Sequence, residues 1–75
     1  MNKERKQKIK NIKQNLDILY DDLRWLKEEE EEYYGNIPEN LQGTLRADES
    51  EEYIDQLEDA IANIEEALDT LGNIS

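Results

Sequence analysis

The chain has 75 residues and a formal net charge of −11, with twenty Asp and Glu against nine Lys and Arg. It contains no His and no Cys, which removes the commonest general base, disulfides and thiolate metal sites, so we expect a non-enzymatic protein without cofactor or metal. No apolar run approaches the length of a membrane span or a secretory leader, and we expect neither.

The first predicted helix covers residues 3–34, which contain no Pro or Gly. Its apolar residues alternate three and four positions apart, the pattern of a heptad repeat. They are Ile9, Ile12, Leu16, Leu19, Leu23 and Leu26. Six cations and Glu4 give residues 1–13 a net charge of +5, and we expect this basic start to pair with acidic side chains near the end of the second helix.

Two further apolar residues of this helix, Ile18 and Trp25, lie seven positions apart and nearly opposite the heptad stripe. Single exposed hydrophobic residues are common, but Trp is enriched in interface hot spots. We therefore expect these two residues to contact a protein partner or a second copy of the chain. The alternative is that neighbouring Lys and Glu stems partly cover both.

The connection, residues 35–46, contains one short helical turn that starts at Pro38, since Pro favours the first position of a helix. Gly35 is expected to end the first helix with a left-handed backbone. Ile37 and Leu41 are expected to tuck under the connection and close that end of the molecule.

The second predicted helix covers residues 47–71. Asp48, followed three residues later by Glu51, predicts a capping box at its start, and Thr44 is an alternative cap one turn earlier. Gly72 is placed to end the helix. The apolar residues repeat the spacing of the first helix, as Ile54, Leu57, Ile61, Ile64, Leu68 and Leu71.

The two apolar series match when the chain is folded so that the numbers of facing residues add up to 80. Six successive layers then pair apolar residues, among them Leu19 opposite Ile61, and the next layer is Glu30 opposite Ser50. The predicted fold class is therefore all-α. A single domain, residues 1–75, forms an antiparallel two-helix hairpin that resembles a coiled coil.

Carboxylates gather where the first helix ends and the second begins. With Arg46 as the single cation, residues 28–55 carry a net charge of −10. The acidic pole is defined here as Glu28, Glu29, Glu31, Glu32, Glu39, Asp48, Glu49, Glu51, Glu52 and Asp55. It is a candidate contact for a basic protein surface, and the alternative is a solvated face that aids solubility.

A hairpin of this size, without a disulfide or a metal, usually needs self-association, because each core residue keeps one side in solvent. The second helix offers apolar residues seven apart beside the seam: Tyr53, Ala60, Ala67 and Ile74. We expect a homodimer, packed as a four-helix bundle, with these residues in the interface. An antiparallel arrangement is favoured, since it brings the basic start of one copy near the acidic pole of the other.

The sequence Asn-Ile-Pro-Glu-Asn-Leu-Gln at residues 36–42 and the sequence Ala-Ile-Ala-Asn-Ile-Glu-Glu-Ala at residues 60–67 carry a resemblance. They resemble short acidic helical proteins of phages and mobile elements of Gram-positive bacteria, in which an Asn-(Ile/Met)-Pro-Glu-(Asn/Ser)-Leu-Gln loop joins two helices. The resemblance implies an origin in such an element. It also implies a location in the cytoplasm of a bacterial host.

By analogy with small acidic phage proteins, we expect a protein that binds and blocks a host protein with a basic surface, such as a defence nuclease. The contact would use the acidic pole or the face with Trp25. One alternative is an oligomerisation or scaffold module without inhibitory activity. Another is a nucleic-acid-binding accessory protein that uses residues 3–13, although the −16 of the remaining chain opposes it. We expect no membrane and no small-molecule partner.

Overall fold

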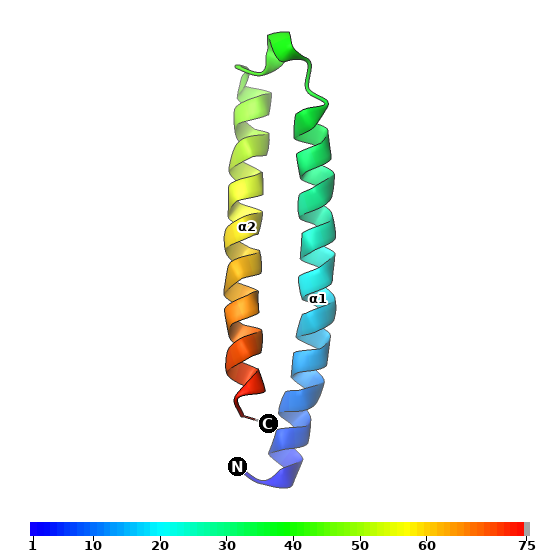
Figure 1. Cartoon of the computed structure of the whole chain (residues 1–75), viewed down its shortest axis with the longest axis vertical. Coiled ribbons are helices and arrows are strands. Elements are labelled where there is room, and N and C mark those ends of the chain that lie inside the picture. Colours follow the sequence, from blue (N-terminus) through cyan, green and yellow to red (C-terminus); the bar gives the residue numbers. More distant parts are fainter. Residues whose placement is uncertain (75) are drawn as a thin grey trace.

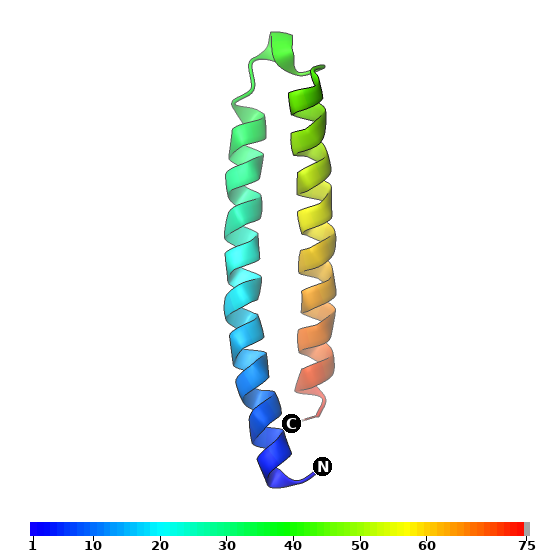
Figure 2. The same cartoon turned by 180° about the vertical axis from the view of Figure 1, so that it is seen from behind.

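The computed structural model describes residues 1–74 as two long helices side by side (Figure 1). Helix α1 spans Lys3–Gly35 and α2 spans Leu45–Gly72, and between them lies η1, one turn of 3-10 helix at Glu39–Leu41. The molecule measures 59 × 14 × 13 Å. The view from behind shows the same antiparallel pair (Figure 2), so the predicted helical hairpin is confirmed.

Helix α2 begins one turn earlier than a cap at Asp48 would place it, at the alternative cap residue that the sequence offered. Thr44 is its N-terminal cap residue, with an extended backbone (φ −83°, ψ 162°), and Leu45 is the first helical residue. The Thr44 hydroxyl donates a 2.6 Å hydrogen bond to the carbonyl oxygen of Leu41, so it stabilises the connection. The predicted capping box at Asp48 is wrong because Asp48 lies within the first turn, where its charge suits the positive end of the helix dipole.

Both helices end without a left-handed residue. Asn36 follows α1 with right-handed backbone angles (φ −92°, ψ −3°), and its N–H donates to the carbonyl oxygens of Glu32 and Tyr33 at 3.1 and 3.2 Å. Asn73 follows α2 in the same way. Because no residue among 1–74 has a positive φ, the prediction for Gly35 is wrong. Tightened backbone hydrogen bonds satisfy the last carbonyl groups instead.

The face that α2 turns to α1 is the one that the heptad spacing predicts. All six apolar residues of its series are buried or half-buried. Ala47, Ser50 and Leu68, which belong to the same two rows, are only 1%, 2% and 9% exposed. These two rows of α2 therefore form one side of the seam between the helices.

Helix α1 turns a different face to its neighbour. Ile12, Leu19 and Leu26 are 56%, 55% and 50% exposed, so the prediction that they fill layers opposite α2 is wrong. Lys and Tyr take their place, because long amphipathic side chains bury apolar stems and keep their polar ends in water. The half-buried residues of α1 are Ile9, Lys13, Leu16, Tyr20, Leu23, Lys27, Glu30 and Tyr34.

The register along the helix axes is the predicted one. The Ser50 hydroxyl donates a 2.9 Å hydrogen bond to Oε1 of Glu30, and these residue numbers add up to 80. A slip along the axis would have separated this pair. The exposure of Leu19 and its neighbours therefore reflects a rotation of α1 about its own axis.

Within the connection, a short helical turn is present as η1, but it begins at Glu39, one residue later than predicted, and Pro38 is its N-terminal cap residue. Ile37 is only 7% exposed, and its carbonyl oxygen accepts a 2.9 Å hydrogen bond from the side-chain amide of Gln42. Leu41 is 40% exposed and lines a small open pocket beside Tyr33 and Arg46. The prediction that both apolar residues close this end of the molecule is therefore right for Ile37 and wrong for Leu41.

Candidate protein-binding surfaces

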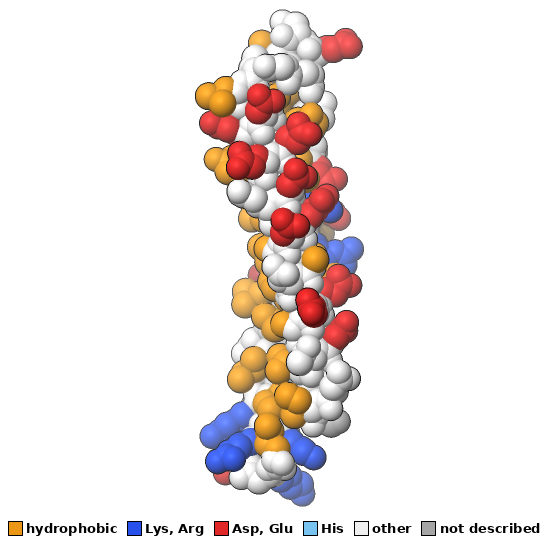
Figure 3. All heavy atoms as spheres, turned by 90° about the vertical axis from the view of Figure 1, so that its left-hand side faces the viewer, with side chains coloured by type: hydrophobic (Ala, Val, Ile, Leu, Met, Phe, Trp, Pro, Cys, Tyr) orange, Lys and Arg blue, Asp and Glu red, His pale blue; other side chains and the backbone are white. Residues whose placement is uncertain are grey.

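The acidic pole lies at the connected end of the hairpin, where Figure 3 shows the acidic side chains gathered. All ten of its residues are exposed. Among residues 1–74, only one of the ten has a cationic partner: Oε1 of Glu31 lies 3.4 Å from Nζ of Lys27. Arg46 instead covers the ring of Tyr33 at 5.2 Å and donates a hydrogen bond to its hydroxyl. The other nine carboxylates therefore remain without a cation.

Lys27 joins the two helices on one side of the seam. Its Nζ atom lies 3.4 Å from a carboxylate oxygen of Glu31 on α1 and 3.4 Å from one of Glu58 on α2. Partial loss of hydration lowers the pKa of Lys27, but the hydrogen bonds and charges of the two glutamates outweigh it and hold the pKa above the ordinary 10.5. The ammonium group is therefore a charged link between α1 and α2.

The basic start, residues 1–13, lies at the opposite end, where Figure 3 shows the Lys and Arg side chains. Its one ion pair among residues 1–74 joins Lys8 to Glu4 at 3.6 Å, one turn apart on an exposed surface. Lys13 lies against the end of α2, where a Cβ atom added to Gly72 would be 3.4 Å from its Nζ. Among the described residues, 1–74, the predicted ion pairs with the acidic end of α2 are therefore not formed.

Trp25 stands on the outer surface of α1, as predicted for a residue opposite the seam. It is 67% exposed, and Ile18 on the same line is 60% exposed. Trp25 lines a shallow pocket of ≈ 270 Å³ with Asp21, Arg24 and Glu28. Its ring is thus flanked by carboxylates one turn before and one turn after it, a setting that suits a Lys or Arg side chain of a partner.

Glu28 belongs to this pocket and to the acidic pole, so the two predicted protein-binding surfaces are continuous along α1. The structure brings together Trp25 and the first acidic residues of the pole. Ile18 lies two turns away, on the same line of the helix but outside the pocket.

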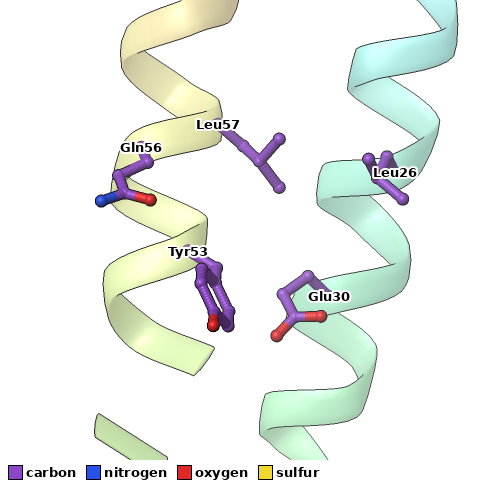
Figure 4. A pocket seen from close by; sticks show the side chains of 5 residues that line it. All are labelled: Leu26, Glu30, Tyr53, Gln56 and Leu57. Atoms are coloured by element: carbon purple, nitrogen blue, oxygen red, sulfur yellow. The ribbon is translucent and has the colours of Figure 1, made fainter. Parts of the chain in front are cut away.

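The residues predicted for a dimer interface lie beside the seam on α2. Tyr53 is 53% exposed, Ala67 and Ile74 are exposed, and Ala60 is half-buried. Tyr53 borders an open groove of ≈ 340 Å³ between the helices (Figure 4). The groove is lined by Leu26, Glu30, Tyr53, Gln56 and Leu57.

Sequence reasoning missed three surface residues of α1: Ile12, Leu19 and Leu26. Because Leu26 and Tyr53 line one groove, the exposed rows of the two helices lie on the same side of the hairpin. The apolar face is defined here as Ile12, Leu19, Leu26, Tyr53, Ala60 and Ala67. The sequence does contain an indication that these α1 residues could be exposed. The neighbouring row of α1 has long side chains with apolar stems, which compete with Leu19 and its row for burial in the seam: Lys13, Tyr20, Lys27 and Tyr34.

Among residues 1–74, no group of three or more acidic side chains is arranged to hold a metal ion. Neither long helix, as far as it is described, contains a stretch apolar enough to cross a membrane.

Comparisons with protein-family models, with curated proteins and with solved structures give no match to this chain. The physical case for its function therefore rests on the acidic pole, the pocket at Trp25 and the apolar face.

Proposed function

We propose that this protein is a non-enzymatic binding protein whose acidic pole occupies a basic surface of another protein. The supporting observation is that all ten carboxylates of the pole are exposed and that, in the part of the chain that the structure describes, nine of them have no cationic partner. Like charges concentrated at one end of a hairpin oppose folding. A cationic partner would remove that repulsion and add charge-assisted hydrogen bonds.

The pocket at Trp25 extends this contact. Trp25 and Glu28 lie beside one another on α1, so one partner surface can meet the carboxylates and the indole ring together. An exposed Trp supplies the apolar centre that a purely ionic contact lacks. The partner that fits this chemistry has Lys or Arg side chains around an apolar depression.

In this proposal the partner is a protein of the bacterial host, and binding blocks it, as the resemblance of residues 36–42 to phage and mobile-element proteins implies. A site that normally holds nucleic acid is the candidate target, since such sites are rich in Lys and Arg. The acidic pole would compete there with phosphate groups.

The test is capture of host proteins by wild-type protein and two charge variants, at low and high salt. The pole variant carries Glu28→Gln, Glu29→Gln and Glu32→Gln, which leaves the Lys27–Glu31 pair intact. The matched control removes three exposed carboxylates at the other end of α2, with Glu65→Gln, Glu66→Gln and Asp69→Asn. We expect the pole variant and high salt to abolish capture of a basic protein, and the control to retain it. Equal capture by both variants would contradict the role of the pole.

The second candidate, an oligomerisation or scaffold module, is favoured by a different observation: no residue of α1 is buried within Lys3–Gly35. The proposed assembly is a homodimer in a four-helix bundle, with Tyr53, Ala60, Ala67 and Ile74 in the interface. Sedimentation equilibrium should then give the mass of a dimer. A monomer whose stability is independent of protein concentration would contradict this assembly, whereas a dimer that captures no basic protein would favour the scaffold role.

A further inference from the structure

We infer that a second copy of the chain packs antiparallel on the apolar face, with Leu19 of each copy facing Leu19 of the other. This inference rests on the proposed homodimer, takes the antiparallel orientation that the charge pattern favours, and adds a surface and a register. Half of that surface belongs to α1, where the sequence pattern assigned Ile12, Leu19 and Leu26 to the seam.

The apolar face has the spacing of a helix-packing surface. Ile12, Leu19 and Leu26 recur every seven residues along α1, and each is at least half exposed. Figure 3 shows hydrophobic side chains exposed along much of the length of the molecule. Each helix of a four-helix bundle packs against two neighbours, and α1 has so far only one.

On the apolar face, each residue of α1 lies level with one residue of α2, and each such pair is called a rung here. Leu26 and Tyr53 border one groove (Figure 4), and their numbers add up to 79, which agrees with the register set by Glu30 and Ser50. The same offset places Leu19 level with Ala60, and the next rung pairs Ile12 with Ala67. Two of the three rungs thus combine a large residue of α1 with a small residue of α2.

The length of α1 selects the register. Because the helix spans Lys3–Gly35, its midpoint is Leu19. We place a two-fold axis between the two hairpins, perpendicular to the helices and level with Leu19. The α1 helices of the two copies then run antiparallel and overlap over their whole length. Ile12 then faces Leu26 of the second copy. On α2, Tyr53 faces Ala67 of the second copy, a large residue against a small one, as close packing requires.

The charges favour the same register. It brings the acidic residues 28–32 of one copy level with residues 6–10 of the other, which contain three lysines and no acid. In the single hairpin the basic start has only the exposed pair between Lys8 and Glu4 among residues 1–74. A parallel dimer would stack two acidic poles of like charge. The charge pattern therefore identifies the occupant as an antiparallel copy of this chain.

This arrangement leaves part of the acidic pole for another partner. The carboxylates that α2 contributes to the pole lie level with residues 65–72 of the second copy, which contain no Lys or Arg. The dimer therefore brings lysines of the second copy level with the α1 part of the pole only. Each end of the dimer retains an anionic surface formed by α2.

Disulfide cross-linking tests the inference, because the chain has no cysteine of its own. Under mild oxidation, Leu19→Cys should form a covalent dimer. A mixture of Ile12→Cys and Leu26→Cys should cross-link at least tenfold more than either variant alone, since facing helices bring such positions within disulfide reach. Ile18→Cys is the matched control, equally exposed on another face of α1, and should remain uncross-linked.

Cross-linking of Leu19→Cys to Ala60→Cys, with no self-linking of Leu19→Cys, would show a parallel dimer and overturn the inference. Sedimentation equilibrium of the wild type distinguishes failure of the proposed face and register from failure of the proposed homodimer. A wild-type dimer without the expected cross-links refutes this face and register only, whereas a wild-type monomer refutes the homodimer as well. Circular dichroism of each variant is the check that it remains folded.

Discussion

The two helices carry the same spacing of apolar residues and use it differently. In α2 both rows of the repeat line the seam, as the burial of Ser50 in one row and Leu68 in the other shows. In α1 only one row does, and Leu19 in the other row is 55% exposed. The comparison shows that a heptad repeat defines an apolar stripe and its axial register, but not which half of the stripe a single neighbour covers.

The rows beside the stripes explain the difference. The row next to the seam on α1 consists of Lys and Tyr, whose stems are apolar, while α2 presents Glu58 on that side. Rotation of α1 toward this row brings Lys27 within 3.4 Å of Glu58. The opposite rotation would bury Leu19 but would lose this ion pair and expose the stem of Lys27.

Ile61→Asp should produce the largest effect. Ile61 is half-buried in the seam of α2, so a charge there loses hydration without gaining a partner. We expect a loss of about 3 kcal/mol, enough to unfold a hairpin of marginal stability. Far-UV circular dichroism should show loss of helicity at every protein concentration. A variant with the wild-type melting temperature would show that α2 does not use this row.

Leu19→Asp is the counterpart on α1. Because Leu19 is exposed in the hairpin, the variant should keep its helicity. It should lose the stabilisation that the proposed dimer adds, about 2.7 kcal/mol at a protein concentration 100 times the dissociation constant. Melting curves at several concentrations provide the measurement. Unfolding as complete as that of Ile61→Asp would place Leu19 in the seam and reverse the comparison.

Ser50→Ala tests the register that both helices share. The substitution removes the donor to Oε1 of Glu30 and leaves a half-buried carboxylate unsatisfied. We expect a loss of about 1–2 kcal/mol in urea denaturation. Addition of Glu30→Leu should restore the stability, because both polar groups are then absent. If Ser50→Ala alone is neutral, the hydrogen bond contributes nothing to the register.

Gly35→Ala distinguishes the right-handed end of α1 seen in the structure from the left-handed end that the sequence predicts. The φ of Gly35 is not positive, and an added Cβ would have no other atom within 4 Å outside its neighbours and its own helix. Alanine should therefore stabilise the protein by about 0.5–1 kcal/mol. Destabilisation of similar size would indicate a left-handed residue. Thermal denaturation measures the difference.

The pH dependence of stability tests the link between the helices. The pKa of Lys27 is raised in the folded protein, so its contribution is present at neutral pH and is lost as the pH rises above 10.5 through the folded pKa. Lys27→Arg keeps its charge in this range and is the control. The urea midpoint of the wild type should fall below that of Lys27→Arg between about pH 9 and about pH 12. A constant difference would show that the ion pairs do not contribute.

Much of the molecule follows from the sequence alone. The apolar spacing predicts both helices and the layer of Glu30 and Ser50, and Pro38 predicts the short turn in the connection, because these features depend on periodicity and local backbone preference. The charge pattern predicts an acidic end and a basic end, since an antiparallel hairpin places chain segments in a fixed order. The exposure of Trp25 follows from the same periodicity.

Tertiary structure alone decided the rotation of α1. The structure was also needed to select Thr44 over Asp48 as the cap of α2 and to show the right-handed ends of both helices. The rotation depends on a small difference between two competing faces, one with Leu19 and one with Lys27. That difference arises from side-chain length and from Glu58 on the other helix, and neither enters the spacing of apolar residues. The surface left open by this choice, and with it the proposed site for a second copy, therefore becomes visible only in the packed hairpin.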